Sequence, residues 1–383
     1  MITDLLRQQK SLLLQQGLYR TRPIIDEYGP HVLNFSSNDY LSLRHDEQVR
    51  RAYAQGFCKH SSGSGASMSV GGYHKIHQEL ERTFAHYLKA DSALLFSSGY
   101  AANLGIVSLL AQLNCHVLID KAVHASIYDG IKLNNIKYTR FLHNNYEDLE
   151  GKLSNSIINP AVITEAIFSM SGQQSNLAIL AKLCATGQIP ILVDEAHSFG
   201  VVGPHGLGAV AYYQLPQHQV PLRLITFSKS LGGQGAIIVG QGEWVEALFQ
   251  QARSNIYSTA VSPALSYGLL KSLDIVMKSD DRRSKLAELI AYFQQKIQKS
   301  PLKWRHSHTP IQQLQLGCPH KALDYALQLK KYGIICQAMR EPTVCRTATG
   351  LRVVLNAQHE PQDIDHLFDR LQQIDDTQSQ PNR

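Results

Sequence analysis

The stretch Ile189-Pro-Ile-Leu-Val-Asp194-Glu-Ala-His197 decides the fold prediction, because an apolar run leads directly into a carboxylate and an imidazole. A second apolar run, Leu222-Arg-Leu-Ile-Thr-Phe227, leads in the same way into Ser228-Lys229. Short apolar runs of this kind are typical of strands that are buried on both faces. We therefore expect a carboxylate, an imidazole and an amine to follow two strands of one sheet. An amine that can form a Schiff base, near a carboxylate that can keep a ring nitrogen protonated, indicates pyridoxal phosphate (PLP) chemistry.

Other apolar runs alternate with helical patterns through the middle of the chain. The further strands expected there are residues 93–97, 116–119, 161–165 and 236–239, and the helices are 101–113, 125–134 and 177–186. Alternation of strands and helices predicts an α/β fold, with a mostly parallel sheet and helices on both of its faces. Ligands of such sheets bind at the carboxyl ends of the strands.

The pattern changes after about residue 275, where a long helix precedes short strands that are separated by helices. This change predicts a smaller α+β domain at the C-terminus. We therefore predict three parts: an N-terminal helix and arm at residues 1–40, a large PLP-binding domain at 41–275 and a small domain at 276–383.

Composition excludes some classes of protein. The 383 residues are 44% apolar and 18% charged, as in an ordinary globular protein of more than one domain. The six cysteines form no C-x-x-C pair, which argues against a zinc ribbon or a disulfide framework and fits a reducing cytoplasm. The formal charge of +6 is compatible with an anionic substrate such as a coenzyme A ester, and equally with a mildly basic surface. No basic cluster with interleaved aromatic residues indicates nucleic-acid binding.

The N-terminal segment, residues 1–16, is not typical of a signal peptide, because Asp4, Arg7 and Lys10 interrupt its leucines. No apolar run is long enough to cross a membrane. We therefore expect a cytoplasmic protein whose first helix packs on its own chain or on a partner subunit. The polar tail, residues 375–383, is expected to fray.

Three other motifs are incomplete. Ser228-Lys229-Ser230 lacks the glycines of a phosphate-binding loop, and Gly203-Pro-His-Gly206-Leu-Gly208 lacks the dinucleotide spacing. His197 and His205 lack the partners and spacing of a zinc site, so we expect no metal.

Six stretches, in order along the chain, resemble the α-oxoamine synthase family of fold-type I PLP enzymes. They are Asn34-Phe-Ser-Ser-Asn-Asp-Tyr-Leu41, Ser98-Gly-Tyr-Ala-Ala-Asn103, Asp120-Lys-Ala-Val-His124-Ala-Ser126, Thr164-Glu-Ala-Ile-Phe-Ser169-Met170, Val193-Asp-Glu-Ala-His-Ser-Phe-Gly200 and Thr226-Phe-Ser-Lys229. Any one of them is weak, but six in the same order are specific. The resemblance covers nearly the whole chain from about Arg20. It implies a PLP-dependent acyltransferase that condenses an amino acid with an acyl thioester and releases carbon dioxide.

The resemblance implies a role for four residues around the cofactor ring. Lys229 is the amine that forms the Schiff base, and Asp194 pairs with the pyridinium nitrogen. His197 hydrogen-bonds the phenolic oxygen, and His124 stacks on the pyridine face and can assist proton transfer. Without the resemblance, Lys229 could be a surface lysine in a loop and Asp194 a helix cap after a strand. His197 could be a core histidine, and His124 a histidine at a helix start.

Further residues match the family's contacts to the cofactor. Gly99 and Tyr100 lie between an expected strand and helix, where backbone amides and the helix dipole suit a phosphate dianion. Thr226 offers a hydroxyl to the phosphate, and Ser169 matches a contact near the phenolic oxygen. Thr259 matches a residue that reaches the phosphate from the neighbouring subunit, which implies a homodimer with shared active sites.

The substrate contacts rest on the resemblance and on general charge chemistry. Arg352 matches the arginine that holds the amino acid carboxylate, a group that a guanidinium can bind with two hydrogen bonds. Arg20 resembles an arginine near the acyl substrate, and Asn38 and Tyr40 lie in a segment near the active-site entrance. Surface arginines remain the alternative for Arg352 and Arg20.

Two segments depart from the family pattern. The glycine-rich stretch, here Gly63-Ser-Gly-Ala66-Ser-Met68, lacks the usual two glycines and serine at its end. The segment Pro342-Thr-Val-Cys345-Arg-Thr-Ala-Thr-Gly350-Leu-Arg352 lacks the second proline and the first of two arginines. The second departure weakens the prediction of the acyl substrate most, since this loop lies near the acyl group in relatives.

Within the family, the stretches are most similar to those of the biotin-synthesis enzymes. These condense L-alanine with a pimeloyl thioester to give 8-amino-7-oxononanoate, and the acyl carrier is either coenzyme A or an acyl carrier protein. A sister enzyme that uses glycine or serine with another acyl-CoA is the alternative. A non-catalytic subunit of a heterodimer is a remote one, because such partners lose the lysine that this chain keeps at Lys229.

Overall fold

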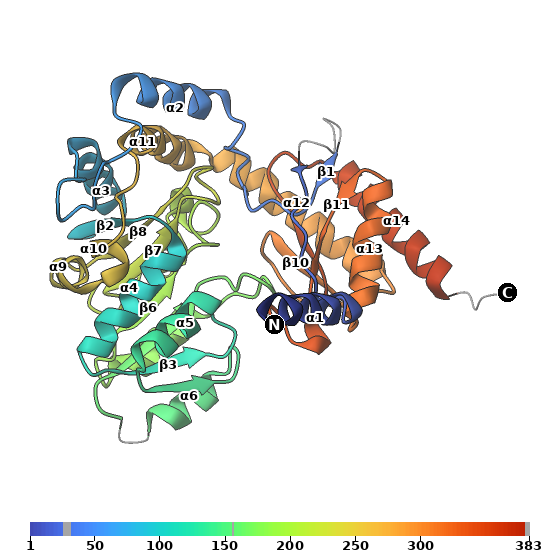
Figure 1. Ribbon diagram of the computed structural model, residues 1–383, viewed down its shortest axis with the longest axis horizontal. Coiled ribbons are helices and arrows are strands. Elements are labelled where there is room, and N and C mark those ends of the chain that lie inside the picture. Colours follow the sequence, from blue (N-terminus) through green and yellow to red (C-terminus); the bar gives the residue numbers. More distant parts are fainter. Residues whose placement is uncertain (26–31, 155–156, 380–383) are drawn as a thin grey trace. The chain divides into compact units, whose positions relative to one another are not determined.

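The computed structural model of the protein describes residues 1–25, 32–154 and 157–379, which form two compact units (Figure 1). The large unit consists of Asp39–Phe168 and Gln174–Arg283. The small unit consists of Met1–Asn38, Ser169–Gln173 and Ser284–Arg383, so the N-terminal segment clusters with the C-terminal part of the chain. Residues 26–31 of the predicted arm and 380–383 of the predicted tail lie outside the described residues.

The large unit contains the predicted α/β sheet. Its strands, in spatial order, are β2 (Ser92–Phe96), β8 (Ala236–Gly240), β7 (Leu222–Thr226), β6 (Ile191–Asp194), β5 (Pro160–Glu165), β3 (His116–Asp120) and β4 (Tyr138–Phe141). Only β8 runs antiparallel to its neighbours, β2 and β7, in the described sheet. The carboxyl ends of the six other strands therefore lie along one edge of the sheet.

Helices cover both faces of this sheet because its strands are apolar on both sides. Leu222 and Leu224 of β7 join a core cluster with α4 (Gly99–Gln112) and α5 (Ala125–Asn134). Ile225 joins a second cluster with α3 (Lys75–Tyr87) and α11 (Pro263–Lys278). The four helices are labelled in Figure 1. Successive side chains of a strand point to opposite faces, which explains the continuous apolar run. The helices of this unit are α2 (Glu47–Lys59), α3 (Lys75–Tyr87), α4 (Gly99–Gln112), α5 (Ala125–Asn134), α6 (Tyr146–Leu153), α7 (Leu177–Ala185), η2 (Pro204–Gly206), α8 (Ala209–Tyr212), α9 (Gly242–Gln251), α10 (Arg253–Ile256) and α11 (Pro263–Lys278).

Two differences from the sequence prediction have local causes. Strand β4 was not predicted, because it is an edge strand in which only Phe141 is buried. Strand β6 begins at Ile191 instead of Ile189, since Pro190 has no N–H to donate to a neighbouring strand. Only the carbonyl oxygen of Pro190 takes part in the sheet, where it accepts from the Val162 N–H at 2.9 Å.

The small unit has the α+β character that the sequence predicted. Its sheet has the order β12 (Gln337–Met339), β13 (Gly350–Val354), β10 (Ile311–Gln315) and β9 (Trp304–Arg305), and all pairs in it are antiparallel. A separate parallel pair joins β1 (Leu33–Asn34) to β11 (Ile334–Ile335). The helices are α1 (Ile2–Gln15), α12 (Asp280–Lys299), which begins in the large unit, α13 (Pro319–Lys331), η3 (Arg346–Ala348) and α14 (Pro361–Ser379).

The last helix corrects one expectation. Residues 375–379 belong to α14 and are helical, although the polar sequence predicted a frayed tail from residue 375. Within the described part of the chain, no helix combines the length and the apolar character needed to span a bilayer.

Candidate active site

The large unit gathers four of the predicted side chains at the carboxyl edge of its sheet. Asp194 is the last residue of β6, and His197 lies in the turn that follows. Lys229 follows β7 by three residues, and His124 caps the start of α5 after β3. Since these strands are parallel, their ends lie at the same edge, as the sequence predicted.

His197 connects the lysine to a buried tyrosine. Lys229 Nζ lies 2.7 Å from His197 Nε2, and the other ring nitrogen, Nδ1, lies 2.5 Å from the Tyr40 hydroxyl. Tyr40 is fully buried and His197 is 4% exposed, so the ring is held on both sides. The arrangement orients the imidazole and places it where it can exchange a proton with the lysine amine.

A second chain of hydrogen bonds joins Asp194 to His124 through Asn103 of α4. The Asn103 amide donates to Asp194 Oδ2 at 2.9 Å and to Ser126 Oγ at 3.0 Å. Ser126 Oγ in turn lies 2.8 Å from His124 Nδ1. The other carboxylate oxygen of Asp194 accepts from the Ala196 N–H at 2.9 Å, so both oxygens have a donor and the carboxylate is fixed in place.

The electrostatic environment favours a neutral His124. Burial lowers the pKa of His124 below its usual value, and the nearby Lys229 ammonium lowers it further, while Asp194 acts in the opposite direction. A neutral imidazole offers a flat face to a ring and a nitrogen that can accept a proton.

The turn between β2 and α4 presents hydrogen-bond donors that suit an anion. The hydroxyl of Ser98 caps the helix by accepting from the Ala101 N–H at 3.1 Å, and the first N–H groups of a helix have no partner within it. A Cβ atom on Gly99 would lie 2.4 Å from Thr226 Cγ2, so only glycine permits this close approach. Thr226 Oγ1 is buried and has no hydrogen-bond partner among the described residues. An unpartnered hydroxyl beside free helix amides fits the phosphate of PLP.

Within the large unit, Tyr100 and Thr259 take no part in the hydrogen bonds described above. The Tyr100 hydroxyl donates to Asp129 Oδ2 at 2.6 Å, and this hydrogen bond raises the pKa of the phenol. Thr259 is exposed in the segment that follows α10, whose next residue, Ala260, donates its N–H to the Ala66 carbonyl.

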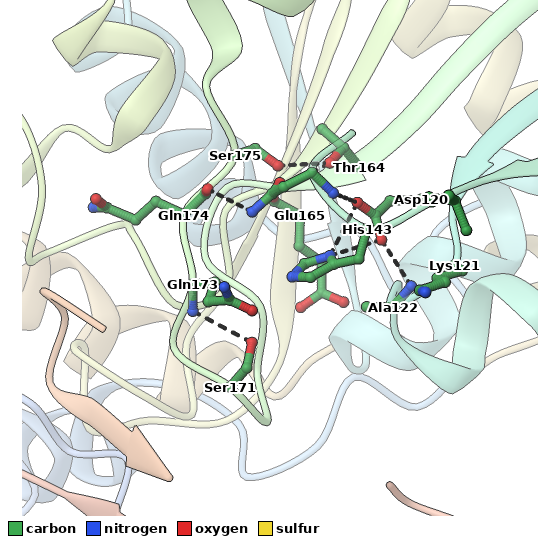
Figure 2. Close-up of polar contacts among 12 residues, drawn as sticks. Asp120, Lys121, Ala122, His143, Thr164, Glu165, Ser171, Gln173, Gln174 and Ser175 are labelled. Atoms are coloured by element: carbon green, nitrogen blue, oxygen red, sulfur yellow. Dashed lines mark hydrogen bonds and ion pairs between the residues drawn. The ribbon is translucent and has the colours of Figure 1, made fainter. Parts of the chain in front are cut away.

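The turn that leads to His124 is held by Asp120, the last residue of β3 (Figure 2). Its carboxylate accepts from the N–H groups of Ala122 and Asn144, both at 2.8 Å, and lies 2.9 Å from His143 Nδ1. Asp120 is 1% exposed, so these donors replace the water that the carboxylate loses. The contacts fix the backbone just ahead of the histidine.

Glu195, which lies between Asp194 and His197 in the sequence, forms a buried ion pair with Arg223. Arg223 Nε of β7 donates to Glu195 Oε2 at 2.6 Å, and Arg223 Nη2 donates to the Leu207 carbonyl at 2.6 Å. Glu195 Oε1 accepts from the Val210 N–H at 3.0 Å. The pair therefore ties the turn after β6 to the neighbouring strand and to the loop before α8.

The remaining predicted residues belong to the small unit. Arg352 of β13 is 3% exposed and donates from Nε to the Ser169 carbonyl at 2.7 Å and from Nη2 to Asn38 Oδ1 at 2.9 Å. The structure thus joins Arg352 to Ser169 within one unit. Arg20 is exposed, and its Nη2 lies 3.3 Å from Thr343 Oγ1.

Sequence reasoning missed the parts that Asn103, Glu195 and Arg223 play. Asn103 and Glu195 lie inside stretches that carried the family resemblance, but no role was inferred for them. A signal was present for Asn103 and Arg223, because each is a polar residue in an otherwise apolar helix or strand and needs a partner when buried. The identity of that partner depends on tertiary packing and could not be inferred.

Comparison with known proteins agrees with this geometry. Residues 30–371 match the family model "Aminotransferase class I and II". The 8-amino-7-oxononanoate synthase of Marinobacter nauticus is 37% identical over 362 residues, which covers 92% of both chains. Among solved structures, an 8-amino-7-oxononanoate synthase from Francisella tularensis has a TM-score of 0.80 at 29% identity, covering 91% of this chain and 99% of that one. A serine palmitoyltransferase from S. paucimobilis, with a bound PLP–myriocin aldimine, has a TM-score of 0.89 at 26% identity, covering 98% and 97%.

Fold and site together define a fold-type I PLP-dependent transferase. Its cofactor is pyridoxal 5'-phosphate, as the sequence predicted. Within that class, the chain belongs to the 8-amino-7-oxononanoate synthase family of PLP-dependent acyltransferases.

Proposed function

We propose that the protein condenses L-alanine with a pimeloyl thioester and releases carbon dioxide, a free thiol and 8-amino-7-oxononanoate. The observation that carries this proposal is the similarity to 8-amino-7-oxononanoate synthases over 92% of the chain. The retention of Lys229, Asp194, His197 and His124 at one edge of the sheet supports it.

When bound, PLP supplies an electron sink for the electrons of a bond broken at the amino acid α-carbon. Asp194 would keep the ring nitrogen protonated, and at about 4 Å and an effective dielectric of about 20 the attraction is about 4 kcal/mol before desolvation. His124 would cover one face of the ring. Thr226 Oγ1, Gly99 and Tyr100 would hold the phosphate at the start of α4.

Lys229 Nζ would hold the cofactor and would take the α-proton of the amino acid. His197 Nε2, at 2.7 Å, can accept or return a proton at that nitrogen, and Tyr40 fixes the orientation of the ring. The α-carbon then forms a bond to the thioester carbonyl carbon while the C–S bond breaks and the thiol leaves. The carboxylate then leaves as carbon dioxide, and a proton returns to the α-carbon to give the product.

The substrate and subunit contacts extend the proposal to the small unit and to a second copy of the chain. Arg352 would bind the alanine carboxylate, because its buried guanidinium is already oriented by Ser169 and Asn38. Thr259 would reach the phosphate of the neighbouring subunit in a homodimer. A mixture of inactive Lys229→Ala and Thr259→Val homodimers should then regain activity on subunit exchange, and no regain would refute sharing.

The proposal is tested by offering L-alanine, glycine and L-serine with pimeloyl, succinyl, acetyl and palmitoyl thioesters and measuring free thiol. We expect turnover with L-alanine and a pimeloyl thioester, presented on coenzyme A or on a carrier protein. Lys229→Ala should abolish both turnover and the visible absorbance of the PLP-loaded protein, whereas Lys278→Ala, an exposed lysine of α11, should change neither. A protein that does not respond to PLP, or that turns over only other pairs, would refute the proposal.

One observation favours a second candidate. The serine palmitoyltransferase structure has the higher TM-score, 0.89 against 0.80. Preference for L-serine with a palmitoyl thioester in the same assay would select this sister activity.

A further inference from the structure

Two buried hydroxyl groups hold the segment Ser169–Gln173 within the small unit. Thr309 Oγ1 donates to the Gly172 carbonyl at 2.9 Å, and Ser307 Oγ lies 3.0 Å from the same oxygen. Both side chains are 2% exposed, and Gly172 is buried. Because a buried carbonyl oxygen needs a donor in place of water, the two hydroxyls stabilise the segment in this position. We refer to Ser307, Thr309 and Gly172 as the hydroxyl clamp.

The packing around Gly172 leaves no space for a side chain. Its φ is +70°, a backbone conformation that glycine adopts without strain. A Cβ atom there would lie 2.1 Å from the Ile311 carbonyl oxygen and 2.5 Å from Ser307 Oγ. Ser307 Oγ is also 2.7 Å from the Ile311 carbonyl, and its single proton serves two acceptors, so Thr309 is the main donor to Gly172.

The turn that carries the two hydroxyls is itself fixed by a buried glutamine. Gln312 of β10 is 0% exposed and donates from Nε2 to the Thr309 carbonyl at 2.7 Å and to the Ser307 carbonyl at 3.3 Å. Its Oε1 accepts from Gln294 Nε2 of α12 at 2.9 Å. Strand β10 and helix α12 therefore both support the clamp.

The other end of the same segment contacts Arg352. The Ser169 carbonyl accepts from Arg352 Nε at 2.7 Å, and Arg352 of β13 is paired with Gln313 of β10, the strand that follows the clamp. Within the segment, Ser171 Oγ accepts from the Gln173 N–H at 3.3 Å (Figure 2). Five residues are thus held by the clamp at Gly172 and by the arginine at Ser169. A displacement of Gly172 would move the carbonyl that orients the Arg352 guanidinium.

We propose that Thr309 and Ser307 are positioning residues for the amino acid substrate, because they hold the segment Ser169–Gln173 where its Ser169 carbonyl orients Arg352. The proposal rests on the proposed function, in which Arg352 binds the substrate carboxylate. A guanidinium binds a carboxylate through two parallel hydrogen bonds only when its plane is correctly oriented. Loosening the clamp should therefore weaken amino acid binding through the arginine.

The test titrates the PLP-saturated protein with L-alanine, without an acyl thioester, and follows the visible absorbance. Thr309→Val keeps the size of the side chain and removes the hydroxyl, whereas Thr309→Ser keeps the hydroxyl. Ser307→Ala is a smaller change to the same clamp and takes the place of Thr309→Val if that variant does not fold. The matched control is Tyr325→Phe, which removes a hydrogen bond between α13 and α14, to Asp375 Oδ1. Arg352→Gln gives the reference loss of affinity.

We expect Thr309→Val to lose about threefold to tenfold in L-alanine affinity, and Ser307→Ala/Thr309→Val about tenfold or more. Thr309→Ser and Tyr325→Phe should keep the affinity of the parent protein. Combined with Arg352→Gln, Thr309→Val should cost no further affinity, because the clamp acts through that arginine. An unchanged affinity in the double clamp variant, an equal loss in Thr309→Ser or Tyr325→Phe, or fully additive losses with Arg352→Gln would overturn the proposal.

The positioning role and the proposed function can fail separately, because only amino acid binding is measured. A protein that binds L-alanine through the clamp and Arg352, but does not condense it with a pimeloyl thioester, would refute the proposed function and leave the positioning role standing. If the parent protein prefers glycine or L-serine, that amino acid replaces L-alanine in the titration, and the same comparisons decide the role of the clamp.

Discussion

The buried pair Glu195–Arg223 should be the most sensitive electrostatic contact of the large unit. The side chains are 0% and 7% exposed, and the pair also contacts the Leu207 carbonyl, the Val210 N–H and the Ser198 hydroxyl. Arg223→Met keeps the apolar stem but leaves the Glu195 carboxylate buried without a cation. Removing one partner of a buried pair typically costs about 3–5 kcal/mol. Since Glu195 stands between Asp194 and His197, the same change should also weaken PLP binding.

The assay is urea unfolding of the protein without cofactor, followed by tryptophan fluorescence, because Trp244 packs on the core of the large unit. The expected loss shifts the unfolding midpoint by about 1 M or more, with an m value of about 3 kcal/mol/M. Arg51→Met is the matched control, since its ion pair with Glu47 is 73% exposed on both sides and should contribute little. The double variant Glu195→Gln/Arg223→Met removes the unpaired charge and keeps an acceptor for the backbone, so it should lose less than Arg223→Met alone. A loss below about 1 kcal/mol for Arg223→Met, or an equal loss in the double variant, would refute the reasoning.

Three further outcomes follow from contacts in the large unit. Thr226→Val should weaken PLP binding by about tenfold in a fluorescence titration. The stability of the cofactor-free protein should not change, because Thr226 Oγ1 has no hydrogen-bond partner among the described residues. A loss of that stability would contradict this prediction. Asn103→Leu should also weaken PLP binding, because Asp194 Oδ2 loses the amide that donates to it. Unaltered affinity in the same titration would show that the Asn103–Asp194 hydrogen bond is not needed for PLP binding. Burial raises the pKa of Glu81 to about 7 from 4.5, so the folded protein retains a proton that the unfolded chain releases between these pH values. The free energy of unfolding should therefore fall as pH rises through this window, by about 3 kcal/mol in all, and Glu81→Gln should abolish that fall in urea titrations at several pH values.

The sequence predicted the sheet well because burial on both faces makes central strands visibly apolar. The five runs that became β2, β3, β5, β7 and β8 were placed within one or two residues of their observed bounds. The edge strand β4 was missed for the converse reason, since its sequence Tyr138-Thr-Arg-Phe141 buries only one side chain. Strand β6 begins two residues later than predicted, because Pro190 lies in an apolar run but has no N–H to donate to a neighbouring strand.

The site could be predicted only where chain order determines position. Asp194, His197 and Lys229 follow strands directly, so a parallel sheet is enough to bring them to one edge. The contacts of Tyr40 to His197 and of Asn103 to Asp194 join residues that are 157 and 91 positions apart. No local pattern specifies such a pairing, because it depends on how helices and loops pack on the finished sheet. The roles given to the predicted residues by resemblance stay predictions until the variants are measured.

The proposed cofactor contacts and the proposed substrate contacts lie mostly in different units of the chain. Apart from Ser169, the proposed cofactor contacts belong to the large unit. The arginines expected to bind substrate, Arg20 and Arg352, both belong to the small unit. Substitutions at Arg20 should therefore alter which acyl group is accepted without altering the cofactor's absorbance. Thr226 and Asn103 variants should alter cofactor affinity without altering the ranking of acyl donors. If a single substitution in the small unit changed both properties equally, the separation of cofactor binding from acyl selection would be wrong.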